Sequence, residues 1–118
     1  MQGTKFPITV HLHGTLAANA SGRFALPWDC SLIAVSSVAS NNSDATLLVG
    51  TTADDDAYLT AATIGDSEVP VTKGRSDFVG GEYPHLAAGT VLEWLLDYDG
   101  SAGTAAQNVT IVFWFTEG

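Results

Sequence analysis

Apolar and polar residues alternate along much of this chain with a period of two, which is typical of β-strands that bury one face. The most apolar such pattern lies in residues 89–115, where two apolar runs flank a stretch rich in turn-forming residues. No segment sustains a 3.6-residue apolar period, and segment 57–63 is ambiguous between a short helical turn and irregular structure. The predicted strands are 6–16, 24–28, 32–39, 45–52, 68–72 and the two apolar runs of 89–115.

Turn signals separate these segments at spacings of about 8–12 residues, which is the pattern of a β-sandwich or barrel. The sequence therefore predicts an all-β, antiparallel fold of about seven or eight strands. A length of 118 residues fits a single domain spanning 1–118. We expect residues 1–5 to form a short polar N-terminal arm and residues 17–22 to form a turn.

The last two predicted strands carry more apolar side chains than one buried face can use. By the period-two rule, Leu92, Trp94, Ile111 and Phe113 share the faces assigned to the core. The opposite faces then expose further apolar residues, which mark interaction surfaces, and tryptophan is enriched at their centres. The alternative is that loops 54–64 and 73–82 cover them. The predicted contact residues are Val112, Trp114, Val91 and Leu95, with Trp28 beside Pro27 as a lesser candidate.

Composition and charge narrow the possible partners. Hydrophobic residues make up 46% of the chain and charged residues only 14%, which excludes a disordered chain and favours a partly covered surface. The net charge of −9 argues against binding nucleic acid or an anionic membrane. Cys30 is the only cysteine, and we expect it to be buried. The sequence has no signal-peptide pattern and no apolar run of 18 residues, so we expect assembly in the cytoplasm.

Two histidines at spacing i, i+2 are a candidate metal pair. His11 and His13 project from one face of a predicted strand, as in the H-x-H motif of cupin enzymes. The resemblance to cupins ends there, because no acid follows the pair and His85 does not have the expected spacing. We therefore favour two histidines on a polar face or at a subunit contact, and we expect no cofactor.

Acidic loops are a second candidate for ion binding. Asp54, Asp55 and Asp56 are consecutive, and Asp97-Tyr98-Asp99-Gly100 begins like a calcium loop. The latter has Asn108 where an EF-hand has glutamate, and Asp-Gly is primarily a turn signal. Solvated turns are the favoured interpretation for both.

Catalytic signatures are weak in this sequence. Glu82 and Glu93 are isolated carboxylates that could serve a glycosidase only if a cleft brought them together. No G-x-S-x-G nucleophile elbow is present. We expect a protein that is not an enzyme.

Three segments resemble small jelly-roll proteins of tailed bacteriophages, some of which decorate or cement capsids. They are residues 22–33, the sequence Thr90-Val91-Leu92-Glu93-Trp94, and Asp97–Gly100 with 109–115. The resemblance implies a jelly-roll sandwich and a structural role on the capsid surface, as a homotrimer bound to the major capsid protein. The alternative function is a carbohydrate- or receptor-binding jelly roll, for which Trp28, Tyr58 and Tyr83 are the candidate aromatics. A metal-dependent enzyme of cupin type is the third.

Overall fold

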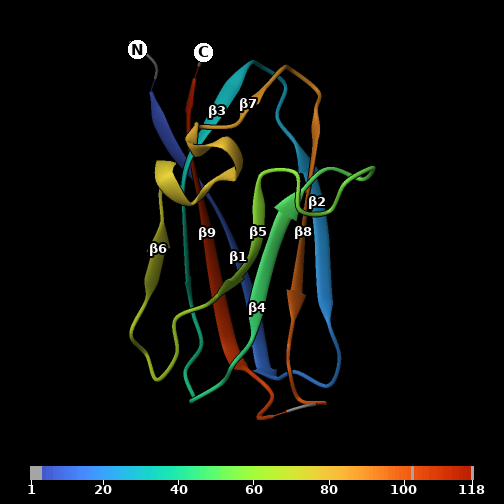
Figure 1. Ribbon diagram of the computed structural model, residues 1–118, viewed down its shortest axis with the longest axis vertical. Coiled ribbons are helices and arrows are strands. Elements are labelled where there is room, and N and C mark those ends of the chain that lie inside the picture. The colour runs from blue at the N-terminus through green and yellow to red at the C-terminus, as the bar shows by residue number, and fades with distance from the viewer. Residues whose placement is uncertain (1–3, 102, 118) are drawn as a thin grey trace.

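The computed structural model describes residues 4–101 and 103–117, which form two antiparallel sheets packed face to face (Figure 1). The strands are β1 (Lys5–Thr15), β2 (Ala20–Ala25), β3 (Cys30–Val38), β4 (Thr46–Gly50), β5 (Leu59–Thr63), β6 (Val71–Lys73), β7 (His85–Leu86), β8 (Val91–Asp97) and β9 (Gln107–Glu117). Two 3-10 turns, η1 (Arg75–Asp77) and η2 (Val79–Gly81), lie between β6 and β7. No helix in the described residues is long and apolar enough to span a membrane.

The strand order identifies the fold as a jelly roll. One sheet runs β1-β9-β3-β6, with the two-residue β7 also paired to β3, and the other runs β2-β8-β4-β5. The first long strand therefore pairs with the last, and the chain crosses from one sheet to the other at every connection except β4–β5 and β6–β7, as in two wound Greek keys. The predicted jelly-roll sandwich is confirmed, with nine strands in the described residues in place of seven or eight.

The core lies between the inner faces of the two sheets. Leu92, Trp94, Ile111 and Phe113 are all buried, as the alternation predicted. Cys30 is fully buried as well. Ile111 and Phe113 lie opposite Val10 and Ile8 of β1 in the ladder, so the inner face of β9 continues onto β1.

Three local predictions were wrong. Segment 57–63 contains a strand, β5, because Leu59 is buried and residues 59–63 complete the ladder with β4. β2 spans Ala20–Ala25, which includes part of the predicted turn. Its central Gly22 lies opposite Trp94, whose ring occupies the space above the glycine. β6 is confined to Val71–Lys73, after Pro70.

The polar N-terminal arm lies partly outside the described residues, because residues 1–3 are not among them. Lys5 is already the first residue of β1, and the backbone carbonyl of Thr4 accepts a hydrogen bond of 3.1 Å from the N–H of Glu117.

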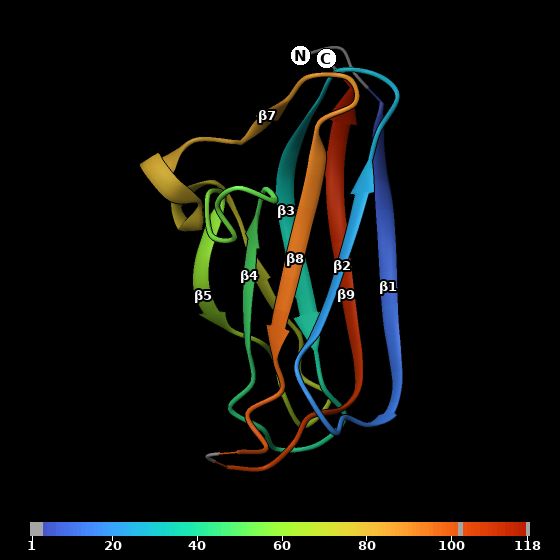
Figure 2. The same ribbon diagram turned by 90° about the vertical axis from the view of Figure 1, so that its right-hand side faces the viewer.

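The two edges of the sandwich differ. At the β5–β6 edge, η1 and η2 fold against the strands, bury Phe78, and place the N–H of Val79 2.9 Å from the carbonyl of Tyr58 (Figure 2). At the β1–β2 edge no residue of either strand is fully buried. The first edge is therefore closed and the second is open.

Candidate interaction surface

The outer face of the β1-β9-β3-β6 sheet centres on Trp114. Its ladder neighbours are Pro7 and Ala34, which are small enough to leave the indole 39% exposed. Val112, two residues away on the same face, is half-buried between Thr9 and Ser36. The loops therefore do not cover this face, and Trp114 is an accessible apolar group among small, uncharged side chains.

The outer face of the β2-β8-β4-β5 sheet presents the other two predicted contact residues. Val91 is 39% exposed and Leu95 is half-buried. Between them Glu93 accepts a 2.7 Å hydrogen bond from Nε of Arg23, and the Glu93 side chain is only 16% exposed. Val91 and Leu95 thus lie on the opposite side of the sandwich from Trp114, so one flat partner surface cannot cover both.

Trp28 lies at the end of the sandwich where β2 leads into β3. Its ring meets the edge of Phe6 at a centroid distance of 5.9 Å, and Phe6 stacks on Phe115 at 5.6 Å. Trp28 remains 46% exposed. It is therefore an exposed extension of the core's aromatic cluster and belongs to the β1–β2 edge.

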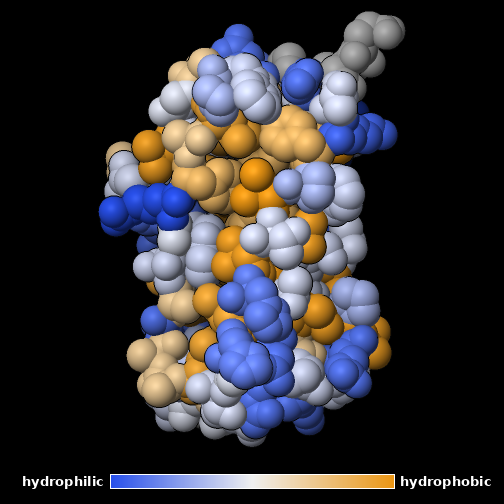
Figure 3. All heavy atoms as spheres, turned by 180° about the vertical axis from the view of Figure 1, so that it is seen from behind, coloured by the Kyte–Doolittle hydropathy of each residue, from blue (hydrophilic) through white to orange (hydrophobic). Residues whose placement is uncertain are grey.

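The open edge between β1 and β2 is a surface that the period-two argument did not single out. Its inward side chains pack on the core but stay partly accessible, and a band of apolar groups runs along this side of the molecule (Figure 3). Alternation reveals which face of a strand is apolar, but not whether a further strand covers it. The open edge comprises Phe6, Ile8, Val10, Leu12, Leu16, Ala20, Phe24 and Leu26.

The histidine pair lies on the outer side of β1. The rings of His11 and His13 are 6.2 Å apart between centroids and both are exposed, and Nδ1 of His11 is 2.9 Å from Oγ1 of Thr110. His85 is instead on β7, with Nδ1 3.4 Å from Oγ of Ser31. The structure therefore places His11 and His13 side by side, as predicted, but His85 does not lie with them.

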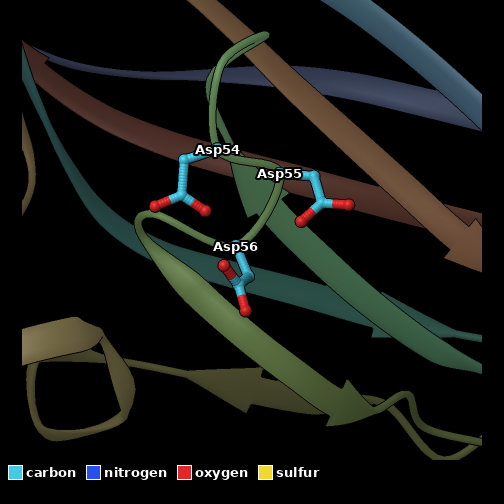
Figure 4. Close-up of side chains that lie close together, drawn as sticks. All are labelled: Asp54, Asp55 and Asp56. Atoms are coloured by element: carbon cyan, nitrogen blue, oxygen red, sulfur yellow. The ribbon is translucent and has the colours of Figure 1, made fainter.

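Asp54, Asp55 and Asp56 lie together in the loop between β4 and β5 (Figure 4). Their carboxylate oxygens fall within 4.8 Å of one another. A side-chain hydrogen bond with Asp54, followed by desolvation and the neighbouring charges, raises the pKa of Asp56 above its ordinary value. Asp54 and Asp55 are exposed and Asp56 is half-buried, which is compatible with a solvated loop.

The second acidic loop is a turn. The carboxylate of Asp97 accepts a 3.0 Å hydrogen bond from the N–H of Asp99, and Asp99 has a positive φ of 52°. The carbonyl of Asp99 then accepts from the N–H of Gly103 at 2.9 Å. The Asp97 carboxylate thus binds a backbone N–H of its own loop, as turn chemistry predicts.

The two isolated glutamates do not share a cleft. Glu82 pairs with Arg75 at 3.3 Å beside η2, whereas Glu93 pairs with Arg23 on the outer sheet face. A shallow hollow of about 290 Å³ lies between β5 and η1, and another of about 340 Å³ lies beside Ser40 and Asn108. Neither hollow is lined by Glu82 or Glu93.

The aromatics considered for glycan binding have other contacts. The guanidinium of Arg75 lies 5.7 Å from the ring centre of Tyr83, which is 46% exposed. Tyr58 is half-buried, and burial, with a smaller contribution from Cys30, raises the pKa of its hydroxyl. Trp28 has one edge against Phe6.

Comparison with solved structures finds chains of similar fold. A chain of the Cyanophage Pam1 capsid asymmetric unit matches with a TM-score of 0.62 and 15% identity, over 99% of this chain and 86% of that one. A chain of the acidic stable capsid of Helicobacter pylori bacteriophage KHP30 matches at 0.44 with 14% identity, over 94% and 93%. The family 11 carbohydrate-binding module of a Clostridium thermocellum cellulase matches at 0.41 with 11% identity, over 97% and 82%.

At these identities the likeness concerns the fold alone, and of these three matches the one to Pam1 has a TM-score above 0.5. It confirms the predicted resemblance to small phage jelly-roll proteins at the level of architecture. No family model matches the sequence, and no curated protein matches it.

Proposed function

We propose that this chain is a structural virion protein, a capsid decoration or cement protein that assembles in the host cytoplasm. Its copies associate, as a homotrimer, and bind the outer surface of the major capsid lattice. The observation that supports the proposal most is the jelly roll shared along 99% of the chain with a chain of the Pam1 capsid. The role is structural rather than catalytic.

Trp114 is the residue proposed to contact the capsid. It combines a large apolar surface with a rigid position on a central strand, and such groups are typical of interface hot spots. Its neighbours on the same face are mostly small and uncharged, so little desolvation of charge opposes docking. The acidic remainder of the protein keeps free copies soluble.

Co-sedimentation with capsids tests the proposal. Purified protein is mixed with capsids assembled from the major capsid protein encoded in the same genome, and bound protein is counted after centrifugation. We expect saturable binding of the wild type and at least a tenfold loss for Trp114→Asp, since the removed side chain would be a hot spot of about 2 kcal/mol or more.

Val91→Asp is the matched control, because Val91 is also 39% exposed but lies on the opposite sheet. It should bind as the wild type does. Wild-type protein that stays in the supernatant at every concentration contradicts the proposed function. Loss of binding by Val91→Asp alone contradicts the assignment of the Trp114 face.

The second candidate, a carbohydrate- or receptor-binding module, is favoured by the exposure of Trp28 and Tyr83, each 46%. Sugar rings stack on exposed aromatic faces, so affinity electrophoresis in gels containing soluble polysaccharides distinguishes this function. Retardation that disappears in Trp28→Ser or Tyr83→Ser would favour it over capsid binding.

A further inference from the structure

The open edge is apolar and has free strand backbone. In the described residues β1 pairs with β9 on one side and β2 pairs with β8 on one side, and each strand's other side has no ladder partner. Pro7 removes one N–H from β1, which disfavours simple addition of another strand. Contact through the half-buried side chains is therefore the way in which this edge would bind a partner.

Charge is distributed unevenly between the open edge and the rest of the chain. Residues 1–28 contain no aspartate or glutamate, and the first acidic residue is Asp29. The same segment holds Lys5 and Arg23, two of the four basic side chains, along with His11 and His13. All 13 carboxylates and only two basic residues lie in the remainder, so an acid-free edge occurs in a protein of net charge −9.

The opposite side of the sandwich is acidic. Residues 51–82, which include β5, β6, η1 and η2, carry seven carboxylates and two basic side chains. We call this segment the acidic edge. Its exposed carboxylates include Asp54, Asp55 and Glu68. Arg23 is paired with Glu93 of β8 at 2.7 Å, so each copy has an apolar side with little net charge and, across the sandwich, an acidic side.

We propose that the open edge of one copy binds the acidic edge of a second copy, head to tail. This inference rests on the proposed function, because it specifies how the oligomer assembles. The acid-free open edge can meet an acidic edge without repulsion, whereas two acidic edges facing each other would repel. A heterologous contact of this kind closes into a ring when the rotation between copies permits, and a trimer is one such ring.

The open edge follows β1 and β2 along the longest axis of the molecule, over which the Cα atoms span 41 Å (Figure 1). Phe6, Phe24 and Trp28 supply the aromatic groups that typically carry the binding energy at one end of the edge.

Complementation between two interface variants tests the proposal. Val10→Glu places a carboxylate in the open edge, and Asp54→Lys combined with Asp55→Lys reverses the charge of the acidic edge. We expect each variant alone to scatter light as one copy at concentrations where the wild type is an oligomer. Mixed one to one, they should associate into at least a two-copy complex, because the unchanged open edge of the lysine variant can still meet the unchanged acidic edge of the glutamate variant.

Thr9→Glu is the matched control, since Thr9 is adjacent to Val10 but points to the exposed outer face. It should retain the wild-type mass. Failure of the mixture to form the two-copy complex, with both variants folded by circular dichroism, overturns the head-to-tail contact. An acidic-edge variant that keeps the wild-type mass also overturns it, because it would show a contact between like edges.

A measurement on the wild type covers the case in which Val10→Glu does not fold. Hydrogen exchange of the β1 and β2 amides should slow as protein concentration rises, and unchanged exchange across the oligomerisation range overturns the inference. The result is separable from the proposed function. A monomeric wild type that co-sediments with capsids contradicts the head-to-tail contact and the homotrimer but not capsid binding, whereas a head-to-tail oligomer that does not bind capsids contradicts only the capsid role.

Discussion

Replacing Gly22 with alanine should destabilise the fold. The same change stabilises a protein where the backbone conformation and the surrounding space can accept a Cβ atom. A Cβ at Gly22 would lie 2.7 Å from three ring atoms of Trp94, and real Cβ contacts are essentially never below 3.0 Å. Trp94 is 5% exposed between the buried Leu92 and Leu96, so its ring cannot retreat into the core. The clash must be relieved by an outward shift of β2, which is an edge strand.

The expected net cost is about 1–2 kcal/mol. Overpacking of this kind costs roughly 1–3 kcal/mol. Against that, loss of backbone freedom in the unfolded chain favours alanine by about 0.4–1 kcal/mol. For a domain of this size the net cost corresponds to a fall in Tm of roughly 4–8 °C. Urea unfolding followed by Trp fluorescence measures the free energy directly, provided that the slope m is unchanged.

Gly74→Ala is the matched control. Gly74 has an extended φ of −120°, and a Cβ there would meet nothing within 4 Å. It should be neutral or slightly stabilising. If Gly22→Ala proves as stable as Gly74→Ala, Trp94 does not lie over the glycine in solution and the proposed packing of β2 on β8 is wrong.

Two further predictions concern buried polar groups. Burial, and then the charge of Asp29, raises the pKa of the Cys30 thiol above its ordinary value of 9.0. A thiol reagent at pH 8 should therefore label the native protein only at the rate of unfolding, and the raised pKa predicts stability that falls as pH rises past about 9. Fast labelling in the absence of denaturant would contradict this. The Oγ1 of Thr116 is buried with no hydrogen-bond partner among the described residues, so Thr116→Val should raise the free energy of unfolding by about 1 kcal/mol. Thr110→Val, which removes the partner of His11, should not be stabilising.

The sequence predicted the core of this fold well, because one face of most strands is consistently apolar. The alternation in β8 and β9 correctly separated Trp94, which is buried, from Trp114, which is exposed. It failed where the period-two signal is short or interrupted. β5 was missed because its sequence, Leu-Thr-Ala-Ala-Thr, has a single large apolar residue, and tertiary pairing with β4 decides its conformation.

The candidate surface was only partly predictable for a different physical reason. The period of two assigns a residue to the inner or outer face of its own sheet, so the outward orientation of Trp114 and Val91 followed from the sequence. It does not say which sheet a strand joins, and therefore could not show that these two residues lie on opposite sides. Nor could it show that β1 and β2 are neighbouring edges, since that depends on the jelly-roll order of all the strands.

The two proposed contacts occupy different parts of the sandwich, and this separation makes the proposals compatible. A head-to-tail contact uses the edges, where β1 and β2 of one copy meet β5 and the 3-10 turns of the next. It leaves the outer face around Trp114 uncovered in every copy of a ring. Several weak Trp114 contacts would then act together on a repeating lattice, and their combined affinity exceeds that of any one by orders of magnitude. Trp114→Asp should therefore abolish capsid binding and leave the oligomer intact, whereas Val10→Glu should weaken capsid binding only through the loss of multivalency.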